Sequence, residues 1–259
     1  MRIARIAHPR GMSFGVVEGD GPGATVSEID GHPFGEIATT GQSWSLEDVR
    51  LMAPMLPSKV VCVGRNYAAH AAEQDAAVPT EPLLFLKPST SVIGPGDAIR
   101  IPPQSQRVDH EAELAIVIGT PGARRVTDPD EAAAAIFGYT CANDVTARDL
   151  QKSDNQWTRA KGFDSFCPLG PWIETEVDVA DIEVRCEVNA SVRQLGRTKD
   201  MIFSPLAVVS YVSHIMTLLP GDVILTGTPE GIEPMVAGDT VSVSIEHIGT
   251  LTNTVVNLD

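Results

Sequence analysis

The chain has 259 residues, a formal net charge of −15 and a hydrophobic content of 43%. This length and apolar content support one large domain with a small appendage. The acidic balance repels polyanions on average, so we expect neither a nucleic-acid partner nor a membrane partner. No signal-peptide run and no apolar stretch of about 18 residues occurs, which predicts a cytoplasmic protein.

Residues 1–56 are predicted to form a small N-terminal β domain. Short strands are expected over 2–9 and 12–21, and a short helix ended by prolines over 45–57. The second domain, 57–259, is predicted to begin with a β-branched strand over 59–64.

The remaining elements of the second domain alternate short strands with a few helices. We expect an Ala-rich helix over 65–74, strands around turns over 82–102, a buried strand over 108–119, and a helix, a strand and a helix start over 128–151. A helix is predicted over 204–218 with Ser204 as N-cap, followed by strands over 221–232 and 238–259. The pattern predicts a mainly β fold with α-helices at its rim, of the α+β class. The cysteines form no C-x-x-C pair, so we expect reduced core thiols.

Two glutamates precede the apolar run of the buried strand over 108–119. In a strand, Glu111 and Glu113 point to the same face with Cα atoms roughly 6.5 to 7 Å apart, and the next residues on that face, Ala115 and Val117, are apolar. A lone E-x-E pair is often a solvated strand face, but buried carboxylates must take up protons or bind a cation. The pattern predicts a compensated site whose oxygen ligands favour Mg²⁺ or Mn²⁺, with Ca²⁺ as a substitute, over zinc.

A third carboxylate is available in the segment 141–151. Asp144 stands at the expected strand end just before a helix, and a facial oxygen site needs such a ligand. Arg148 at i+4 and Gln151 at i+7 are expected on the same side of the helix start, where a guanidinium and an amide suit a substrate carboxylate. Two alternatives remain open: Asp144 as a helix N-cap, and a salt bridge between Asp144 and Arg148.

Three further residues suggest catalysis or binding. His70 and Glu73 are spaced i, i+3 in the Ala-rich helix, where a carboxylate that orients an imidazole makes a general base. The alternative is an exposed histidine. Lys161 follows a Trp-containing segment, and in the turn Gly227-Thr228-Pro229 the N–H groups and the hydroxyl can hold a carboxylate. Surface lysines and G-T-P turns are also common without such a role.

Six motifs, taken in order, resemble the fumarylacetoacetate hydrolase family. They are VGRNYAAHAAE, PLLFLKPSTSVIGPGD, DHEAELAIVIG, GYTCANDVTARDLQ, WTRAKGFDSFCPLGPWI and PGDVILTGTPEGI, and they cover the chain from about residue 59 to its end. Residues 1–56 match only loosely the small N-terminal domain that some members carry. The resemblance implies a mixed β-sandwich roll and a homodimer.

The resemblance also implies roles for individual residues. Mg²⁺ or Mn²⁺ would be bound by Glu111, Glu113 and Asp144. A dyad of His70 and Glu73 would lie on a segment that orders over the substrate, with Lys161 as the cationic stabiliser. The implied substrate contacts are Arg65, Arg148, Gln151, Gly227 and Thr228.

One position departs from the pattern of fumarylacetoacetase itself, which has an acidic metal ligand seven residues before the catalytic histidine. Here that position is Val63, which argues against fumarylacetoacetate as the substrate. The chain is more similar to the short branch that includes acylpyruvate hydrolases, oxaloacetate decarboxylases and 2-hydroxyhepta-2,4-diene-1,7-dioate isomerases of aromatic catabolism.

These activities share one chemical core, an enolate of a small 2-oxo acid stabilised by a cation. We therefore expect a metal-dependent enzyme acting on a small 2-oxo acid, with carbon–carbon bond hydrolysis or decarboxylation ranked ahead of isomerisation. The alternative from another class is a non-catalytic metal-binding or metabolite-binding protein on the same scaffold.

Overall fold

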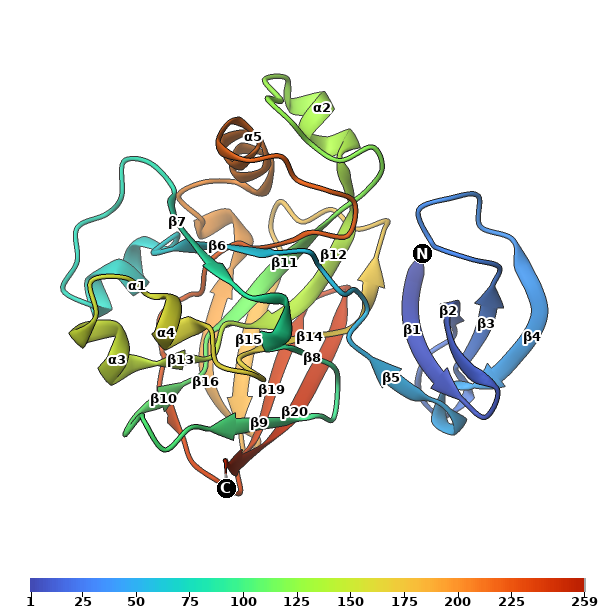
Figure 1. The fold of residues 1–259 in the computed structure, drawn as a ribbon, viewed down its shortest axis with the longest axis horizontal. Helices are drawn as coiled ribbons and strands as arrows, with labels where there is room; N and C mark the ends of the chain where they lie inside the picture. The colour runs from blue at the N-terminus through green and yellow to red at the C-terminus, as the bar shows by residue number, and fades with distance from the viewer. Residues whose placement is uncertain (259) are drawn as a thin grey trace.

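The computed structural model describes residues 1–258, and within them the chain forms three sheets with short helices at the rim (Figure 1). The largest sheet has 12 strands in the order β4-β3-β2-β1-β14-β12-β11-β17-β6-β7, with β5 beside β1 and β8 beside β14. Its strands are β1 Arg2–His8, β2 Gly11–Glu18, β3 Thr25–Ile29, β4 Thr39–Ser45, β5 Arg50–Met52, β6 Val60–Gly64, β7 Leu83–Lys87, β8 Val92–Ile93, β11 Ala112–Ile118, β12 Ile136–Asn143, β14 Cys167–Glu174 and β17 Val223–Leu225.

Two smaller sheets complete the strand framework. The five-stranded sheet, in the order β16-β15-β19-β20-β9, contains β9 Ala98–Ile101, β15 Glu183–Val188, β16 Ser191–Arg197, β19 Thr240–Ile245 and β20 Gly249–Asn257. The three-stranded sheet, in the order β13-β10-β18, contains β10 Val108–Asp109, β13 Thr146–Ala147 and β18 Pro234–Met235. The mainly β, α+β fold expected from the sequence is confirmed.

The helices are short. The α-helices of the described residues are α1 Ala68–Glu73, α2 Pro129–Ala134, α3 Arg148–Ser153, α4 Thr158–Lys161 and α5 Pro205–Ile215, and the 3-10 helices are η1 Gly21–Gly23, η2 Leu46–Asp48, η3 Ser89–Ser91 and η4 Thr198–Asp200. Helix α5 confirms the prediction over 204–218, with the Ser204 hydroxyl accepting from the N–H of Ala207. In residues 1–258 no helix has the length and apolar content to span a bilayer. Asp259, which ends the strand segment predicted over 238–259, lies outside the described residues.

Strand β11 is buried over its whole length and separates two parts of the core. On one face, Ile116 and Ile118 pack against α5 and α2. On the other, Ala115 and Val117 pack with residues of β6, β14 and β17. Glu113 shares this second face because side chains alternate along a strand, so its carboxylate stands at the end of an apolar layer. The four cysteines are buried and free, as predicted.

The N-terminal strands are joined to the main sheet by hydrogen bonds between β1 and β14, with Ile3 opposite Ile173. They lie on the right in Figure 1 and are coloured blue. The helix predicted over 45–57 is wrong: η2 is followed there by β5. Strand β5 pairs with β1, with Leu51 opposite Ile6, so sheet pairing satisfies the backbone that a helix would have satisfied internally.

Asn66 ties the connection between β6 and α1 to two other loops. Its Nδ2 donates to the carbonyls of Phe203 at 2.9 Å and Thr226 at 2.7 Å, and its Oδ1 accepts from the N–H of Phe203 at 2.8 Å. The side chain is fully buried. Water therefore does not replace these bonds, and they hold the start of α1 against the core.

Replacing Asn66 by alanine is expected to lower the free energy of unfolding by about 2 to 4 kcal/mol, because one buried and two partly buried backbone groups lose their partner. Urea unfolding measures this change. The exposed Asn155 provides a control, whose replacement by alanine is expected to change stability by no more than about 0.5 kcal/mol. Equal effects of the two substitutions would contradict the anchoring role of Asn66.

Candidate active site

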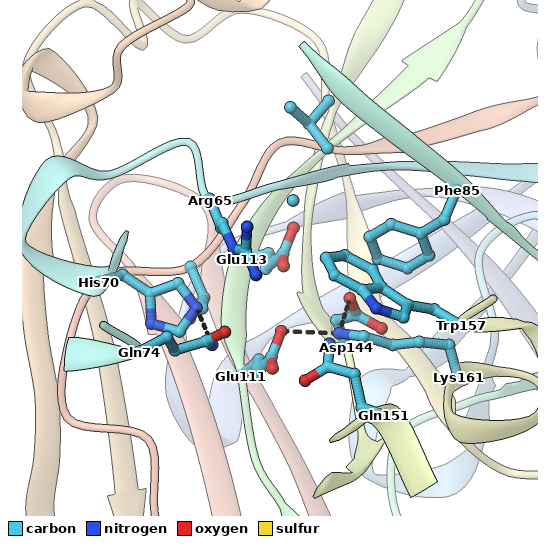
Figure 2. A pocket seen from close by; sticks show the side chains of 13 residues that line it. Arg65, His70, Gln74, Phe85, Glu111, Glu113, Asp144, Gln151, Trp157 and Lys161 are labelled. Carbon is cyan, nitrogen blue, oxygen red and sulfur yellow. Dashed lines mark hydrogen bonds and ion pairs between the residues drawn. The ribbon is translucent and has the colours of Figure 1, made fainter. Parts of the chain in front are cut away.

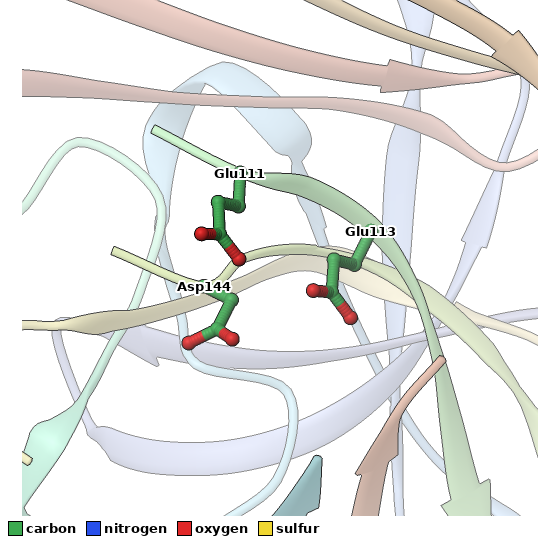
Figure 3. A group of neighbouring side chains, drawn as sticks. All are labelled: Glu111, Glu113 and Asp144. Atoms are coloured by element: carbon green, nitrogen blue, oxygen red, sulfur yellow. The ribbon is translucent and has the colours of Figure 1, made fainter. Parts of the chain in front are cut away.

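Three carboxylates meet in the interior where β11 and β12 lie side by side (Figure 3). Glu113 is the second residue of β11, Glu111 precedes that strand, and Asp144 directly follows β12. The N–H of Asp144 donates to the carbonyl of Glu111 at 2.8 Å. The three residues, called here the acidic triad, offer oxygen atoms within 4.8 Å of one another, and none is more than 4% exposed.

The expected helical alignment of Asp144 and Arg148 is wrong, since α3 begins only at Arg148. The intervening residues Thr146–Ala147 form β13, which pairs with β10. Asp144 therefore ends a strand and is not the N-cap of this helix. The guanidinium of Arg148 pairs with Asp109 and Glu111 instead, so the alternative of a salt bridge to Asp144 is also wrong.

Three cations surround the acidic triad. Lys161 of α4 donates to Glu111 Oε2 at 2.9 Å and to Asp144 Oδ2 at 2.6 Å (Figure 2). Lys87, the last residue of β7, donates to the other oxygen of Asp144, and Arg148 donates to the other oxygen of Glu111. Both lysines are almost fully buried, so these interactions act in a low dielectric.

The surrounding cations compensate the charges of the three carboxylates unequally. Burial opposes ionisation of Glu111, but the charges of Lys161 and Arg148 outweigh it and hold the pKa of Glu111 well below its usual range. Burial and the charges of the other two carboxylates raise the pKa of Glu113 well above its usual range. Its one hydrogen bond among the described residues comes from the N–H of Gly227 at 2.6 Å.

The acidic triad fits a hard divalent cation. A donor set made only of carboxylate oxygens is the one that Mg²⁺, Mn²⁺ and Ca²⁺ prefer. The carboxylate of Glu113 has no cationic partner among residues 1–258, and a bound cation would supply the charge that keeps it ionised. Glu111, Glu113 and Asp144 are thus the residues suited to hold the ion.

His70 lies across the cavity from Lys161 (Figure 2) and is 3% exposed. Its Nδ1 is 3.1 Å from Glu73 Oε2, and its Nε2 is 2.8 Å from the amide nitrogen of Gln74. The carboxylate of Glu73 only accepts, so Nδ1 carries the proton of this hydrogen bond, and Nε2 faces the side-chain amide of Gln74. The other oxygen of Glu73 accepts from the N–H of Gly231 at 3.0 Å, which fixes the carboxylate that orients the ring.

The start of this segment is anchored more firmly than its Ala-rich composition suggests. Asn66, Tyr67, His70 and Ala71 are all buried. The ordering over substrate, expected for residues 66–75, stays a prediction, and the exposed residues at the end of this segment are Ala72, Glu73 and Asp75.

A narrow cavity of about 10 Å³ lies between these groups (Figure 2). It brings together eight of the predicted site residues: Arg65, His70, Glu111, Glu113, Asp144, Gln151, Lys161 and Thr228. Val63 also lines it, so the position where fumarylacetoacetase has a further acid is an apolar part of the wall. The other predicted residues, Glu73, Arg148 and Gly227, do not line this cavity.

Arg148 and Gly227 were expected to contact substrate, but here they position other site residues. All three nitrogens of the Arg148 side chain are engaged, Nε by Asp109 at 2.9 Å and the other two by Glu111 and Gln151. The N–H of Gly227 donates to the carboxylate of Glu113.

Thr228 is held by a network that reaches the five-stranded sheet. Its hydroxyl donates to the carbonyl of Ala112 at 2.8 Å and accepts from the amide of Gln194, in β16, at 2.8 Å. The amide oxygen of Gln194 accepts from the N–H of Ala112 at 3.0 Å. This network fixes the backbone between Glu111 and Glu113.

Sequence reasoning missed four residues of this site. Asp109 continues the alternation of Glu111 and Glu113 by two residues, so the period-2 pattern contained a signal for it. Lys87, a charged residue at the end of an apolar strand, was only weakly indicated by the sequence. No sequence pattern indicated Gln74 and Trp157, which line the cavity.

Both parts of the chain match known protein families. Residues 59–256 match the family described as fumarylacetoacetate (FAA) hydrolase C-terminal, and residues 1–54 match the one described as Rv2993c-like, N-terminal. The chain belongs to the fumarylacetoacetate hydrolase family. The resemblance seen in the six sequence motifs is thereby confirmed.

Three relatives illustrate the range of the family. The solved structure of 2-hydroxyhepta-2,4-diene-1,7-dioate isomerase from Mycobacterium marinum is 54% identical, with a TM-score of 0.92, and the match covers 99% of this chain and 98% of that one. Oxaloacetate tautomerase FAHD2A, mitochondrial, from Homo sapiens is 46% identical over 81% of this chain and 70% of its own. Maleylpyruvate hydrolase from Sphingobium sp. SYK-6, solved with manganese(II) and pyruvate, is 30% identical with a TM-score of 0.82 over 100% of both chains.

Glu113→Gln is expected to weaken Mn²⁺ binding at least about tenfold, because ion affinity follows the number of ligand charges. The amide oxygen of glutamine can still accept from Gly227, and the loss of one buried charge removes repulsion. We therefore expect the ion-free variant to unfold at the same temperature as the wild type or higher. Calorimetric titration and thermal unfolding measure the two effects.

The exposed Glu36 provides the matched control, and Glu36→Gln is expected to change neither quantity. Unchanged Mn²⁺ affinity in Glu113→Gln, or full activity of the wild type in excess chelator, would contradict the assignment of the triad.

Proposed function

We propose that this chain is a divalent-metal-dependent enzyme that transfers a proton at C3 of a small 2-oxo acid through an enolate. One observation carries the proposal: the imidazole of His70, oriented by Glu73, has its second ring nitrogen Nε2 on the same cavity as the acidic triad and Lys161. A base and a group of charges suited to an enolate thus border one small space.

The positive charges of the site act on the 2-oxo carboxylate end of the substrate. A divalent cation held by the triad would supply a Lewis acid for the oxygen at C2. The ammonium of Lys161 adds a fixed charge there, and its preorganised position stabilises negative charge as it develops. Phe85 lies 4.9 Å from this ammonium and packs against Trp157, which keeps water away from that side of the lysine.

His70 moves the proton. Gln74 must release Nε2, which then accepts a proton from C3, while Nδ1 keeps its hydrogen bond to Glu73 and the carboxylate stabilises the imidazolium. Delivery of this proton to the oxygen at C2 gives the enol and completes tautomerisation, whereas its return to C3 regenerates the keto acid. Its delivery to a more distant carbon of a conjugated chain gives isomerisation.

The relatives support placing proton transfer first, which reverses the ranking made from the sequence. Proteins named tautomerase and isomerase are 46% and 54% identical to this chain, whereas the maleylpyruvate hydrolase is 30% identical. Hydrolysis of an acylpyruvate is the second candidate, favoured by the same base. There His70 would take a proton from water as the oxygen attacks the distal carbonyl, and the C3–C4 bond would break to release a carboxylic acid and the enolate of pyruvate.

His70→Ala separates these reactions. NMR in D₂O with Mg²⁺ measures the exchange of the C3 protons of 2-oxopentanedioate. This compound undergoes neither hydrolysis nor decarboxylation through an enolate at C3, so the exchange reports proton transfer alone. We expect exchange to slow by about 10² to 10⁴ fold, the usual effect of removing a general base. Hydrolysis of acetylpyruvate is expected to fall likewise if it occurs, whereas decarboxylation of oxaloacetate needs no base and is expected to fall less.

The exposed His247 provides the control, and His247→Ala is expected to behave as the wild type. Wild-type exchange no faster than the background would contradict the proposed function. A parallel fall of proton exchange and decarboxylation would show that His70 acts in binding or closure and not as a base.

A further inference from the structure

A second and larger cavity opens beside the first. Its volume is about 440 Å³, against about 10 Å³ for the inner cavity. Arg65, Gln74, Gln151 and Trp157 line both cavities and are called here the neck. The inner cavity has room for about one water molecule, so a 2-oxo acid whose oxygens reach the triad must place its remaining atoms in the neck and beyond it.

Positive side chains predominate around the outer cavity. Its charged lining residues are Arg65, Arg107, Arg148, Lys152, Glu73 and Asp75. Arg107 pairs with Asp109, and Arg148 pairs with Asp109 and Glu111. Within residues 1–258, Lys152 and Arg65 form no ion pair. Two of the lining cations are therefore available for a ligand.

Arg65 is held at the neck by features that point to a missing partner. Its φ is 58°, a left-handed conformation that is uncommon for non-glycine residues. Its guanidinium carbon lies 5.7 Å from the ring centroid of Trp157, and the ring leaves no space for a Cβ at Gly64. The Nε atom is buried without a hydrogen-bond partner, which is unfavourable unless a ligand provides an acceptor.

We propose that Arg65 and Lys152 bind a carboxylate at the distal end of the substrate, so that the enzyme selects 2-oxo dicarboxylates over 2-oxo acids with a neutral tail. The inference rests on the proposed function, which places the 2-oxo end in the inner cavity. A distal carboxylate would accept charge-assisted hydrogen bonds from both side chains. A neutral tail would leave the buried donor of Arg65 unsatisfied, which disfavours such ligands.

Paired ligands that cannot be cleaved test this subsite. In 2-oxoheptanedioate and 2-oxoheptanoate the distal carboxylate of one is a methyl group in the other, and 2-oxopentanedioate and 2-oxopentanoate form a shorter pair. Titration into the Mn²⁺-loaded protein gives the ratio of dissociation constants for each pair. In the wild type we expect the dicarboxylate to bind about tenfold tighter in at least one pair, as one charged hydrogen bond would give.

Arg65→Met and Lys152→Met are each expected to reduce that ratio several-fold, and the double variant to bring it to about one. Lys199→Met, at an exposed lysine that pairs with Asp181, is the matched control and is expected to keep the wild-type ratio. Because Lys152 is exposed, its variant gives a result even if Arg65→Met fails to fold.

Oxalate tests the metal site without the distal subsite, because it has no tail to place in the outer cavity. Tight binding of oxalate together with equal affinities for both members of each pair would overturn the distal subsite alone. A wild-type preference that survives both substitutions would also overturn the assignment. Absence of oxalate binding by the Mn²⁺-loaded protein would contradict the proposed function as well.

Discussion

The burial of three carboxylates within 4.8 Å of one another is the constraint on which the rest of this structure depends. Their mutual repulsion is offset from several elements: Lys87 comes from β7, Lys161 from α4, Arg148 from α3, and the N–H of Gly227 from the end of β17. Each of these donors lies on a strand, at the end of one, or on a short helix packed against the sheet. Because uncompensated charge in a low dielectric is costly, these distant segments are held around one point.

The groups suited to catalysis and the cations that are free to bind a ligand lie in two different cavities. The inner cavity contains the base and the charges needed for an enolate, and its small size excludes most water. The outer cavity is wider and has unpaired positive charge on its wall. Asn66 anchors the start of α1 and His70 is buried, whereas Gln74, one turn later, lies in the neck.

The sequence predicted the parts of this site that depend on local periodicity. Alternation along the strand was enough to place Glu111 and Glu113 on one face, and i, i+3 spacing was enough to pair His70 with Glu73. The helical relation of Asp144 to Arg148 was wrong because pairing of β13 with β10 overrides local helix propensity. The role of Lys87 depends on strand pairing between β6 and β7, a tertiary feature that local patterns do not contain.

The central claim is that the acidic triad is a divalent-cation site that Lys161 borders. A crystal structure of the protein with Mn²⁺, phased by the anomalous signal of the metal, tests it most directly. The account predicts one ion within about 2.0 to 2.6 Å of an oxygen from each of Glu111, Glu113 and Asp144, the range of oxygen ligands for hard cations. An ion bound elsewhere, or no ion at saturating Mn²⁺ with Lys161 still joining Glu111 to Asp144, would contradict the account.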